Sequence, residues 1–544
     1  MIKKHGLWFA IQYYLVIPFF LLAVVLLAAM KPLFLFLCNY YLKLTPESSF
    51  YHTFQLVLPM VLFVFWFSIV FTTCRNKKYA YETGRSFPKD RGKYKRSYAE
   101  LLEYFQDAEP HKLDTSDFKK MNWRTAKGIV FGTSNSKLIQ IPTASECNIA
   151  VFGPPGSGKS AGLAIINAIT FEGSVLAVDI KGDLFTYVSK HTDRKLVRFC
   201  PDSPTALQDS IRFDPFSDLK NMDITDQKLY LESMATVLIA DEGGSDNNYF
   251  TTRARKLFQG ITHLILYTNP QASFPDVIHA ILQGNVFDWV TRAIDSACTP
   301  AKELLASFYG NNEKNVSSAY DALTTALVHF SNPVLDVLLS KSEQSLSLQT
   351  LENGFDVYLQ ISQEHLDAYA QLFTLLIQNL SIACTKRPDS STGTGITNRP
   401  ILMLLDEFPQ LTFSYQLINA NLSTLRSKSV ICMLIQQNLS QLEYRFQQTG
   451  ARSILGNCNY QIILGSNDIT SSKTFSDTFG TKKVLKISNS ETASKNDSTG
   501  RSIQEATEKV FPPEYFGDLP AQNKMIIYFK GKYLECNKLN CYKD

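Results

Sequence analysis

The chain has 544 residues, of which 45% are hydrophobic and 19% are charged, so it is long enough for several domains with apolar cores. A formal net charge of +4 is too small for a protein that coats nucleic acid by general electrostatic attraction. The ten cysteines form no Cys-x-x-Cys pair, and no two histidines have the spacing of metal ligands. The sequence therefore predicts reduced thiols and no structural zinc.

Two apolar stretches near the N-terminus, Leu7–Met30 and Phe54–Cys74, contain no charged residue. Each is long enough for a membrane-spanning helix, which needs about 20 apolar residues. Basic residues precede the first stretch and follow the second, so both ends are expected in the cytoplasm. We predict a membrane anchor with two transmembrane helices over residues 1–78 and a basic juxtamembrane stem over residues 79–127. A cleaved signal peptide is the alternative for the first stretch.

A glycine-rich loop follows the apolar run Ile149–Phe152 and precedes a helix-compatible segment over residues 161–170. Its Gly-x-x-x-x-Gly-Lys-Ser spacing is that of the P-loop, in which backbone N–H groups cradle phosphates, the lysine reaches their oxygens and the serine binds Mg²⁺. A chance match within a turn is the alternative, which the preceding strand and following helix argue against. The residues expected to hold a nucleoside triphosphate are Gly153, Pro154, Pro155, Gly156, Ser157, Gly158, Lys159, Ser160 and Ala161.

A second motif is the buried-strand run Ile401–Leu405, which ends in Asp406 and Glu407. Two carboxylates at this point are typical of a Walker B motif, where Asp406 supports Mg²⁺ and Glu407 polarises the attacking water. A core strand that ends in a solvated acidic turn is the alternative. About 250 residues separate Lys159 from Asp406, which indicates an inserted domain.

Further polar residues follow other predicted strands. Asp179, Lys181 and Asp183 lie at the carboxyl end of a strand that begins at Val175, where ligands gather in open α/β sheets. We expect these side chains to be able to face the nucleotide.

The strand Val430–Ile435 is followed by Gln436 and Gln437, and a glutamine there can orient water and sense the γ-phosphate. Two polar residues that start the next helix are the alternative. Arg426 ends a helical stretch, and an arginine at a subunit border can stabilise transition-state charge in a neighbour. A solvated arginine is the alternative.

The stretch between the two motifs contains helical-period runs at Tyr249–Tyr267, Val277–Ala293 and Ala319–Phe330. We predict an all-α domain over residues 274–340, which divides a nucleotide-binding domain into parts at 128–273 and 341–544. A short strand is expected to end at Arg212–Phe216, and a mobile loop is expected at Ser488–Arg501.

These motifs together resemble those of type IV secretion coupling proteins of the TraG/TraD class, membrane ATPases that hand substrates to a bacterial conjugation or effector-secretion channel. The segments that carry the resemblance are Gly153–Ser160, Asp179–Asp183, Arg212–Phe216, Asn248–Arg255, Leu405–Pro409 and Ile435–Leu442. The resemblance implies an α/β fold: a RecA-like P-loop NTPase domain with an inserted all-α domain, preceded by two transmembrane helices. It also implies a multi-pass protein of the bacterial inner membrane, with its large domain in the cytoplasm and a homo-hexameric ring around a channel.

The resemblance implies ATP and Mg²⁺ as cofactors, and other type IV secretion components, DNA with its relaxase or effector proteins, and the membrane as partners. It matches Arg426 to an arginine offered to the neighbouring subunit and Gln436 to the sensing glutamine; with Lys159 and Glu407 these form the expected catalytic set. Ser160 and Asp406 are expected at the metal. The chain departs from the family where Pro155 replaces a frequent threonine and Asp183 replaces a commoner glutamate.

Two other functions fit the same motifs. A DNA translocase of the segregation or packaging type would share the motor, and a nucleotide-binding membrane scaffold would share the site without turnover. A membrane AAA protease is disfavoured because the sequence contains no His-Glu-x-x-His motif. The sequence leaves open whether the cargo is DNA, protein or both.

Overall fold

The computed structural model describes Tyr40 and residues 112–219, 222–240, 245–390, 398–492 and 498–543. The chain divides into two compact units, of which the larger, here called the body, contains residues 111–480 and 509–544. Both predicted membrane spans lie outside the described residues, as does most of the predicted stem. Within the described part of the chain, no helix combines the length and apolar character needed to cross a bilayer.

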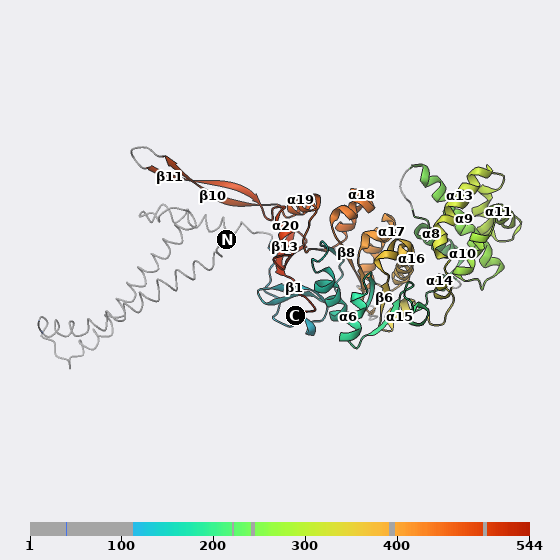
Figure 1. Cartoon of the computed structure of the whole chain (residues 1–544), viewed down its shortest axis with the longest axis horizontal. Coiled ribbons are helices and arrows are strands. Elements are labelled where there is room, and N and C mark those ends of the chain that lie inside the picture. The colour runs from blue at the N-terminus through green and yellow to red at the C-terminus, as the bar shows by residue number, and fades with distance from the viewer. Residues whose placement is uncertain are drawn as a thin grey trace. The chain divides into compact units, whose positions relative to one another are not determined.

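The body is built on an 11-stranded sheet with the order β2-β1-β13-β12-β9-β3-β8-β7-β4-β6-β5 (Figure 1). The seven strands from β9 to β5 run parallel, and the other four are joined to them by antiparallel pairing. The strands of this sheet are β1 (Ile129–Ser134), β2 (Lys137–Ile141), β3 (Ile149–Phe152), β4 (Ser174–Asp179), β5 (Lys195–Phe199), β6 (Phe355–Gln360), β7 (Ile401–Leu405), β8 (Val430–Gln436), β9 (Tyr460–Ile463), β12 (Lys524–Phe529) and β13 (Lys532–Asn537).

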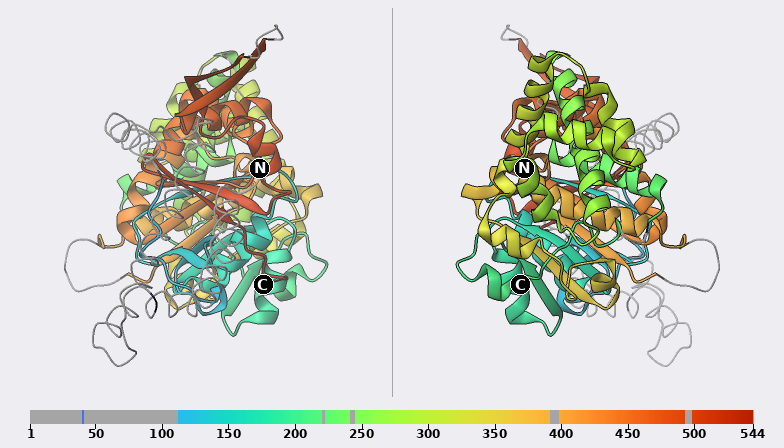
Figure 2. Two further views of the ribbon diagram at one scale, coloured as in Figure 1. Left: turned by 90° about the vertical axis from the view of Figure 1, so that its left-hand side faces the viewer. Right: turned by 90° about the vertical axis from the view of Figure 1, so that its right-hand side faces the viewer.

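The sheet has helices on both faces, and the right-hand view of Figure 2 has the helices of residues 245–338 in front. The α-helices of the body are α5 (Ile165–Thr170), α6 (Asp183–His191), α7 (Ala206–Asp209), α8 (Ile224–Leu238), α9 (Ser245–Thr268), α10 (Phe274–Gln283), α11 (Val286–Asp295), α12 (Thr299–Leu305), α13 (Glu313–Leu327), α14 (Pro333–Leu338), α15 (Leu348–Glu352), α16 (Leu366–Thr385), α17 (Tyr415–Thr424), α18 (Leu439–Gly456), α19 (Ile469–Thr478) and α20 (Tyr515–Asp518).

Side chains of the parallel strands alternate between two hydrophobic cores, one on each face of the sheet. In β3, Ala150 and Phe152 belong to one core, whereas Ile149 and Val151 belong to the other. All four residues are fully buried, as expected for a strand covered on both faces. The central strands therefore read as uninterrupted apolar runs, which is why the sequence predicts them well.

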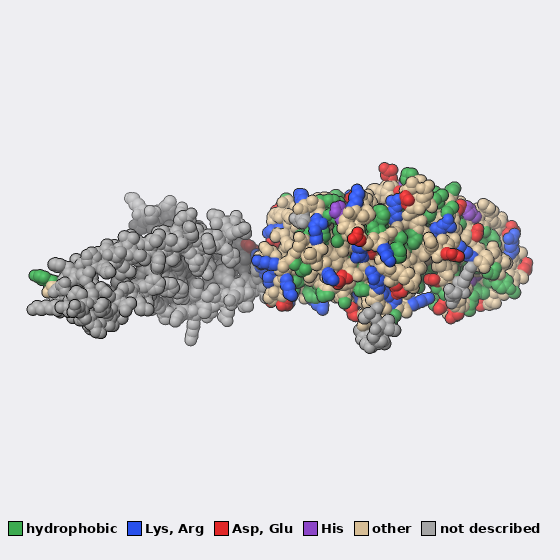
Figure 3. Space-filling model, turned by 90° about the horizontal axis from the view of Figure 1, so that it is seen from below, with side chains coloured by type: hydrophobic (Ala, Val, Ile, Leu, Met, Phe, Trp, Pro, Cys, Tyr) green, Lys and Arg blue, Asp and Glu red, His purple; other side chains and the backbone are tan. Residues whose placement is uncertain are grey.

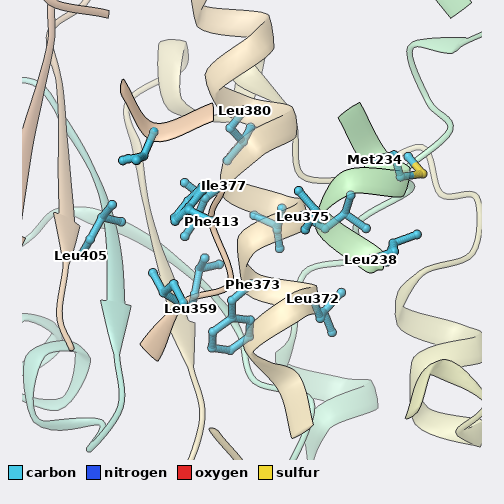
Figure 4. Packing of buried hydrophobic residues seen from close by; sticks show 14 of the residues in the cluster. Met234, Leu238, Leu359, Leu372, Phe373, Leu375, Ile377, Leu380, Leu405 and Phe413 are labelled. Atoms are coloured by element: carbon cyan, nitrogen blue, oxygen red, sulfur yellow. The ribbon is translucent and has the colours of Figure 1, made fainter. Parts of the chain in front are cut away.

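Helix α16 is buried between the sheet and α8. Figure 4 shows its Phe373 beside Leu359 of β6 and its Leu375 toward α8, where Met234 and Leu238 lie. Leu375 is fully buried, and burying a leucine side chain contributes about 2 kcal/mol. Helix α16 therefore connects the sheet and the helical part of the body through one hydrophobic core.

The edge of the parallel sheet is held by a buried ion pair. Arg194 lies just before β5, and its guanidinium donates to Asp356 of β6 at 2.7 Å. Asp356 also accepts the N–H of Val175 at 2.9 Å, and Arg194 donates to the Phe171 carbonyl at 2.7 Å. The Asp356 side chain is fully buried, so its charge depends on this arginine.

The described residues between β5 and β6 contain helices and no strand, apart from isolated β-bridges. The predicted helical runs are found, but the run Val277–Ala293 is two helices, because Gly284 ends α10 and the Asn285 side chain caps α11. The strand predicted at Arg212–Phe216 was wrong: Arg212 forms only an isolated bridge with Ser345.

The second unit contributes one described two-stranded sheet, formed by β10 (Thr481–Thr492) and β11 (Ser498–Lys509). The mobile loop predicted at Ser488–Arg501 was wrong at both ends, because these strands occupy 488–492 and 498–501. A polar hairpin lacks the apolar alternation by which strands are recognised, so sequence alone does not reveal it.

Candidate nucleotide site

The P-loop follows β3 at the carboxyl edge of the parallel sheet. The Gly153 N–H donates to the carbonyl of Gln436 at 3.1 Å, which ties the loop to the end of β8. A Cβ on Gly153 would lie 2.4 Å from the Ser157 hydroxyl, so a side chain there would require this part of the loop to shift. Gly158 has a φ of 96°, a left-handed conformation that glycine adopts without strain. The loop is therefore a compact cradle whose shape depends on its glycines.

A π-helical turn, Lys159–Ala164, begins directly after the loop and continues into α5. The Lys159 ammonium bends back over the loop and donates to the carbonyls of Gly153 at 2.7 Å and Pro154 at 3.3 Å. Burial lowers the pKa of Lys159, and the carboxylates of Glu407 and Asp406 oppose that shift. A cation buried over a glycine loop, with carboxylates nearby, is suited to polyphosphate with its metal ion.

Asp406 and Glu407 follow β7, two strands away from the P-loop strand. Burial, reinforced by the charge of Glu407, raises the pKa of Asp406 to about 6. Asp406 also lines one small pocket together with Ser160, Asp179, Lys181 and Asp183. Ser160 and Asp406 therefore meet as two oxygen donors, the ligand type that Mg²⁺ prefers.

Glu407 has a left-handed backbone, with a φ of 48°, which is uncommon for a residue with a side chain. One of its carboxylate oxygens accepts from the Gln437 amide at 3.1 Å, and the other is buried without a hydrogen-bond partner among the described residues. The Gln436 side chain is fully buried, and neither its amide nitrogen nor its amide oxygen finds a partner in the described part of the chain. Gln437, the second glutamine of the pair, is the one that contacts Glu407.

Asp179 ends β4 and accepts the N–H groups of Leu184 and Phe185 at the start of α6, at 3.3 and 2.9 Å. The Gln360 amide donates to it as well, at 3.2 Å. Burial raises the pKa of Asp179 despite these hydrogen bonds. Asp179 thus orients the start of α6, and it lines the pocket together with Lys181 and Asp183.

Arg426 lies in the short 3₁₀ turn Leu425–Lys428, just before β8 begins. Since β8 has seven residues and runs parallel to β3, Arg426 is at the opposite edge of the sheet from the P-loop, about 20 Å away at about 3.3 Å per residue. Its guanidinium is instead close enough to Cys147 to oppose the rise that burial causes in that thiol's pKa. The structure does not bring Arg426 to the P-loop of its own chain.

Sequence reasoning missed Lys538, which follows β13 and reaches the P-loop from the C-terminal side. Its ammonium donates to the Ser157 carbonyl at 2.9 Å. The next residues continue across the first turns of the P-loop helix, where the Cys541 N–H donates to Ala161 at 3.0 Å. No motif marks this segment, and its position emerges only from the pairing of β13 with β1 and β12.

The fit of this site to a nucleotide rests on three observations. A Cβ would be crowded at Gly153 of the loop, three side chains around the loop carry buried polar atoms without partners among the described residues, and a hydroxyl and a carboxylate line one pocket. The unpartnered atoms are Ser157 Oγ, Glu407 Oε2 and both amide atoms of Gln436.

Solved structures show the same fold. The bacterial conjugative coupling protein TrwBdeltaN70 matches with a TM-score of 0.59 at 18% identity, covering 78% of this chain and 91% of that one. TrwB in complex with ADP and Mg²⁺ matches with a TM-score of 0.59 at 16% identity, over 79% of this chain and 93% of that one. The predicted RecA-like α/β fold is thereby confirmed.

Sequence relatives and a family model extend the comparison. Protein VirD4 of Rhizobium radiobacter is 25% identical over 433 residues, or 77% of this chain and 61% of its own length. The conjugal transfer protein TraG of Escherichia coli is 22% identical over 424 residues, or 71% of this chain and 65% of its own length. The chain thus matches less than two thirds of the length of these relatives. Because residues 111–544 match the model of the type IV secretory system conjugative DNA transfer family, the chain belongs to that family.

Proposed function

We propose that this chain is an ATPase that delivers DNA, as a relaxase-bound single strand, or protein substrates to a type IV secretion channel. The observation that carries the proposal is the convergence of Lys159, Ser160 and Asp406 at one edge of the sheet, in a chain of the conjugative DNA transfer family. The complex of the relative TrwB with ADP and Mg²⁺ supports ATP and Mg²⁺ as cofactors.

Each residue of the site has a separate role in hydrolysis. Gly153 to Ala161 bind the phosphates, and Lys159 exchanges its loop carbonyls for phosphate oxygens. Ser160 and Asp406 hold the metal, which supplies charge neutralisation at the phosphates when bound. Glu407 accepts a proton from the attacking water through its free oxygen, while Gln437 holds the other oxygen. Gln436 is the residue that senses the γ-phosphate.

We further propose that the active form is a homo-hexameric ring. Arg426 lies at the edge of the sheet opposite the P-loop of its own chain, so we assign it to the nucleotide site of a neighbouring subunit. An arginine supplied in trans stabilises the charge that develops on the transferred phosphoryl group. Hydrolysis would then require contact between subunits, which couples turnover to assembly.

For the rest of the chain we propose the domain boundaries that the sequence predicts. Residues 1–78 form a two-helix anchor in the bacterial inner membrane, 79–127 the stem, and 274–340 an all-α domain inserted in the cytoplasmic nucleotide-binding domain (128–273 and 341–544). On the face of the body drawn in Figure 3, described basic and acidic side chains are interspersed. This pattern fits selective contact with cargo and secretion components better than general attraction to polyanions.

The test is steady-state ATP hydrolysis by the full-length chain in mild detergent, with and without single-stranded or duplex DNA, over a range of protein and salt concentrations. Stimulation by single-stranded DNA that rises cooperatively with protein and falls with salt supports delivery of DNA. Turnover that is indifferent to DNA supports protein cargo. Movement along duplex DNA without secretion partners would favour a segregation-type translocase, and nucleotide binding without turnover would favour a scaffold.

A further inference from the structure

Lys538 is a buried lysine that the proposed mechanism does not use. Only 7% of its surface is exposed, and its ammonium lies between two backbone carbonyls. It donates to Ser157 in the P-loop at 2.9 Å and to Leu464, just after β9, at 3.0 Å. The Leu464 N–H in turn donates to the carbonyl of Phe152 at the end of β3, at 2.8 Å. Lys538 thus joins the P-loop to the strand that flanks β3.

The charge of Lys538 is poorly compensated. In the described part of the chain its hydrogen-bond partners are two neutral carbonyls, and it forms no ion pair with a carboxylate. Burial accordingly lowers the pKa of its ammonium to about 8. A buried cation without a counter-charge is costly unless an anion binds nearby. The methylene chain of Lys538 passes 3.9 Å from the position that a Cβ of Gly158 would occupy, so that anion would lie at the P-loop.

The hydrogen bond to Ser157 also fixes the orientation of one peptide group. In a trans peptide the C=O and the following N–H point in opposite directions. Because the Ser157 carbonyl is held by Lys538, the N–H of Gly158 points away from Lys538. That N–H donates to no other residue among those the structure describes. It is therefore available to an oxygen on the inner side of the loop.

We propose that Lys538 is a positioning residue for the nucleotide, which turns the Gly158 N–H toward the phosphates and adds a fixed positive charge behind the loop. This inference rests on the proposed nucleotide site and deepens it. Lys159 and Lys538 then have separate tasks. Lys159 moves onto the phosphate oxygens, whereas Lys538 stays on the Ser157 carbonyl and keeps the cradle in its binding shape.

The experiment compares the full-length chain with Lys538→Met, which keeps the methylene packing and removes the ammonium. Equilibrium binding of a fluorescent ATP analogue and steady-state ATP hydrolysis are measured on both. We expect Kd and KM to rise about tenfold, or about 1.4 kcal/mol, with kcat changed less than about threefold. The matched control is Lys524→Met, which removes a lysine of the β12–β13 hairpin whose ammonium pairs with Glu535. Its Kd and KM should match the wild type.

The outcomes separate this inference from the proposed function. Wild-type protein that binds no nucleotide would refute the proposed function, whereas equal ATP affinity in wild type and Lys538→Met would refute the role of Lys538 alone. A purely structural role predicts a lower melting temperature with unchanged affinity in the folded fraction.

If Lys538→Met does not fold, lysine labelling of the wild type decides. Reductive methylation is followed residue by residue by mass spectrometry, with and without ADP and Mg²⁺. Bound phosphates stabilise the ammonium form, so methylation of Lys538 should slow at least threefold while that of Lys524 is unchanged. An unchanged Lys538 rate would overturn the inference.

Discussion

Asp406→Asn should make the nucleotide-free protein more stable while it removes Mg-nucleotide binding. Asp406 is buried beside Glu407, and its pKa is raised from 3.8 to about 6. Because the folded-state pKa lies above the unfolded value, the folded protein binds the extra proton between these two values. Stability is therefore lost as the pH rises through about 6, and the full cost of ionising Asp406 is present at pH 8.

The size of this cost follows from the shift. A shift of about two pKa units corresponds to about 3 kcal/mol, at about 1.4 kcal/mol per unit. This is an upper bound for the increase in the free energy of unfolding when the carboxylate is replaced by an amide. At pH 5 the Asp406 carboxylate is mostly protonated in the folded state, so the expected stability difference between Asp406→Asn and wild type falls to about half of its value at pH 8. For a large domain, about 3 kcal/mol corresponds to a shift in melting temperature of roughly 3 °C or more.

The assay is thermal melting of full-length wild type and Asp406→Asn, at pH 8 and pH 5, with and without ATP and Mg²⁺. Without ligand the variant should melt higher, and more so at pH 8. With ligand the order should reverse, because ligand that binds the folded state raises only the wild-type midpoint. A variant that melts lower than wild type at pH 8 without ligand would contradict the assignment of Asp406 as a buried charge kept for function.

Five other variants have defined expected outcomes. Lys159→Ala should abolish ATP binding, and Glu407→Gln should preserve binding while slowing hydrolysis at least about 100-fold, as measured by fluorescent-nucleotide titration and phosphate release. Arg426→Ala should be inactive alone but recover partial ATPase activity when co-assembled with Lys159→Ala, since mixed interfaces then contain one intact site; no recovery would contradict an arginine supplied in trans. Arg194→Met, which leaves a buried carboxylate unpaired, should cost about 3 kcal/mol, visible as a lower melting temperature. Lys127→Met removes only an exposed pair and should cost less than about 1 kcal/mol.

The central strands and the loop after β3 could be predicted from the sequence because their signals are local. A strand buried on both faces is an apolar run, such as Ile401–Leu405, and the P-loop is a fixed spacing of glycines before Lys159. The helical runs were also visible, although the break at Gly284 required knowledge of how α10 ends.

The remainder depends on contacts between distant residues. Lys538 contacts Ser157, which is 381 positions away in the sequence, and no local sequence pattern around Lys538 predicts that contact. The choice between Gln436 and Gln437 as the partner of Glu407 depends on which way a side chain leaves the end of β8. The hairpin β10–β11 is polar on both strands, so composition alone suggested a loop.

The strand order has a consequence for how the protein is made. β3, which carries the P-loop, pairs only with β8 and β9 within the sheet, and Ile149 lies opposite Met433 and Tyr460. A ribosome that adds about 5–20 residues per second needs roughly 15–60 s to synthesise the intervening chain. During that time the backbone N–H and C=O groups along both edges of β3 have no partner strand, and such edges associate readily with other strands. Synthesis of this chain should therefore depend on chaperones that shield the nascent P-loop strand until β8 emerges.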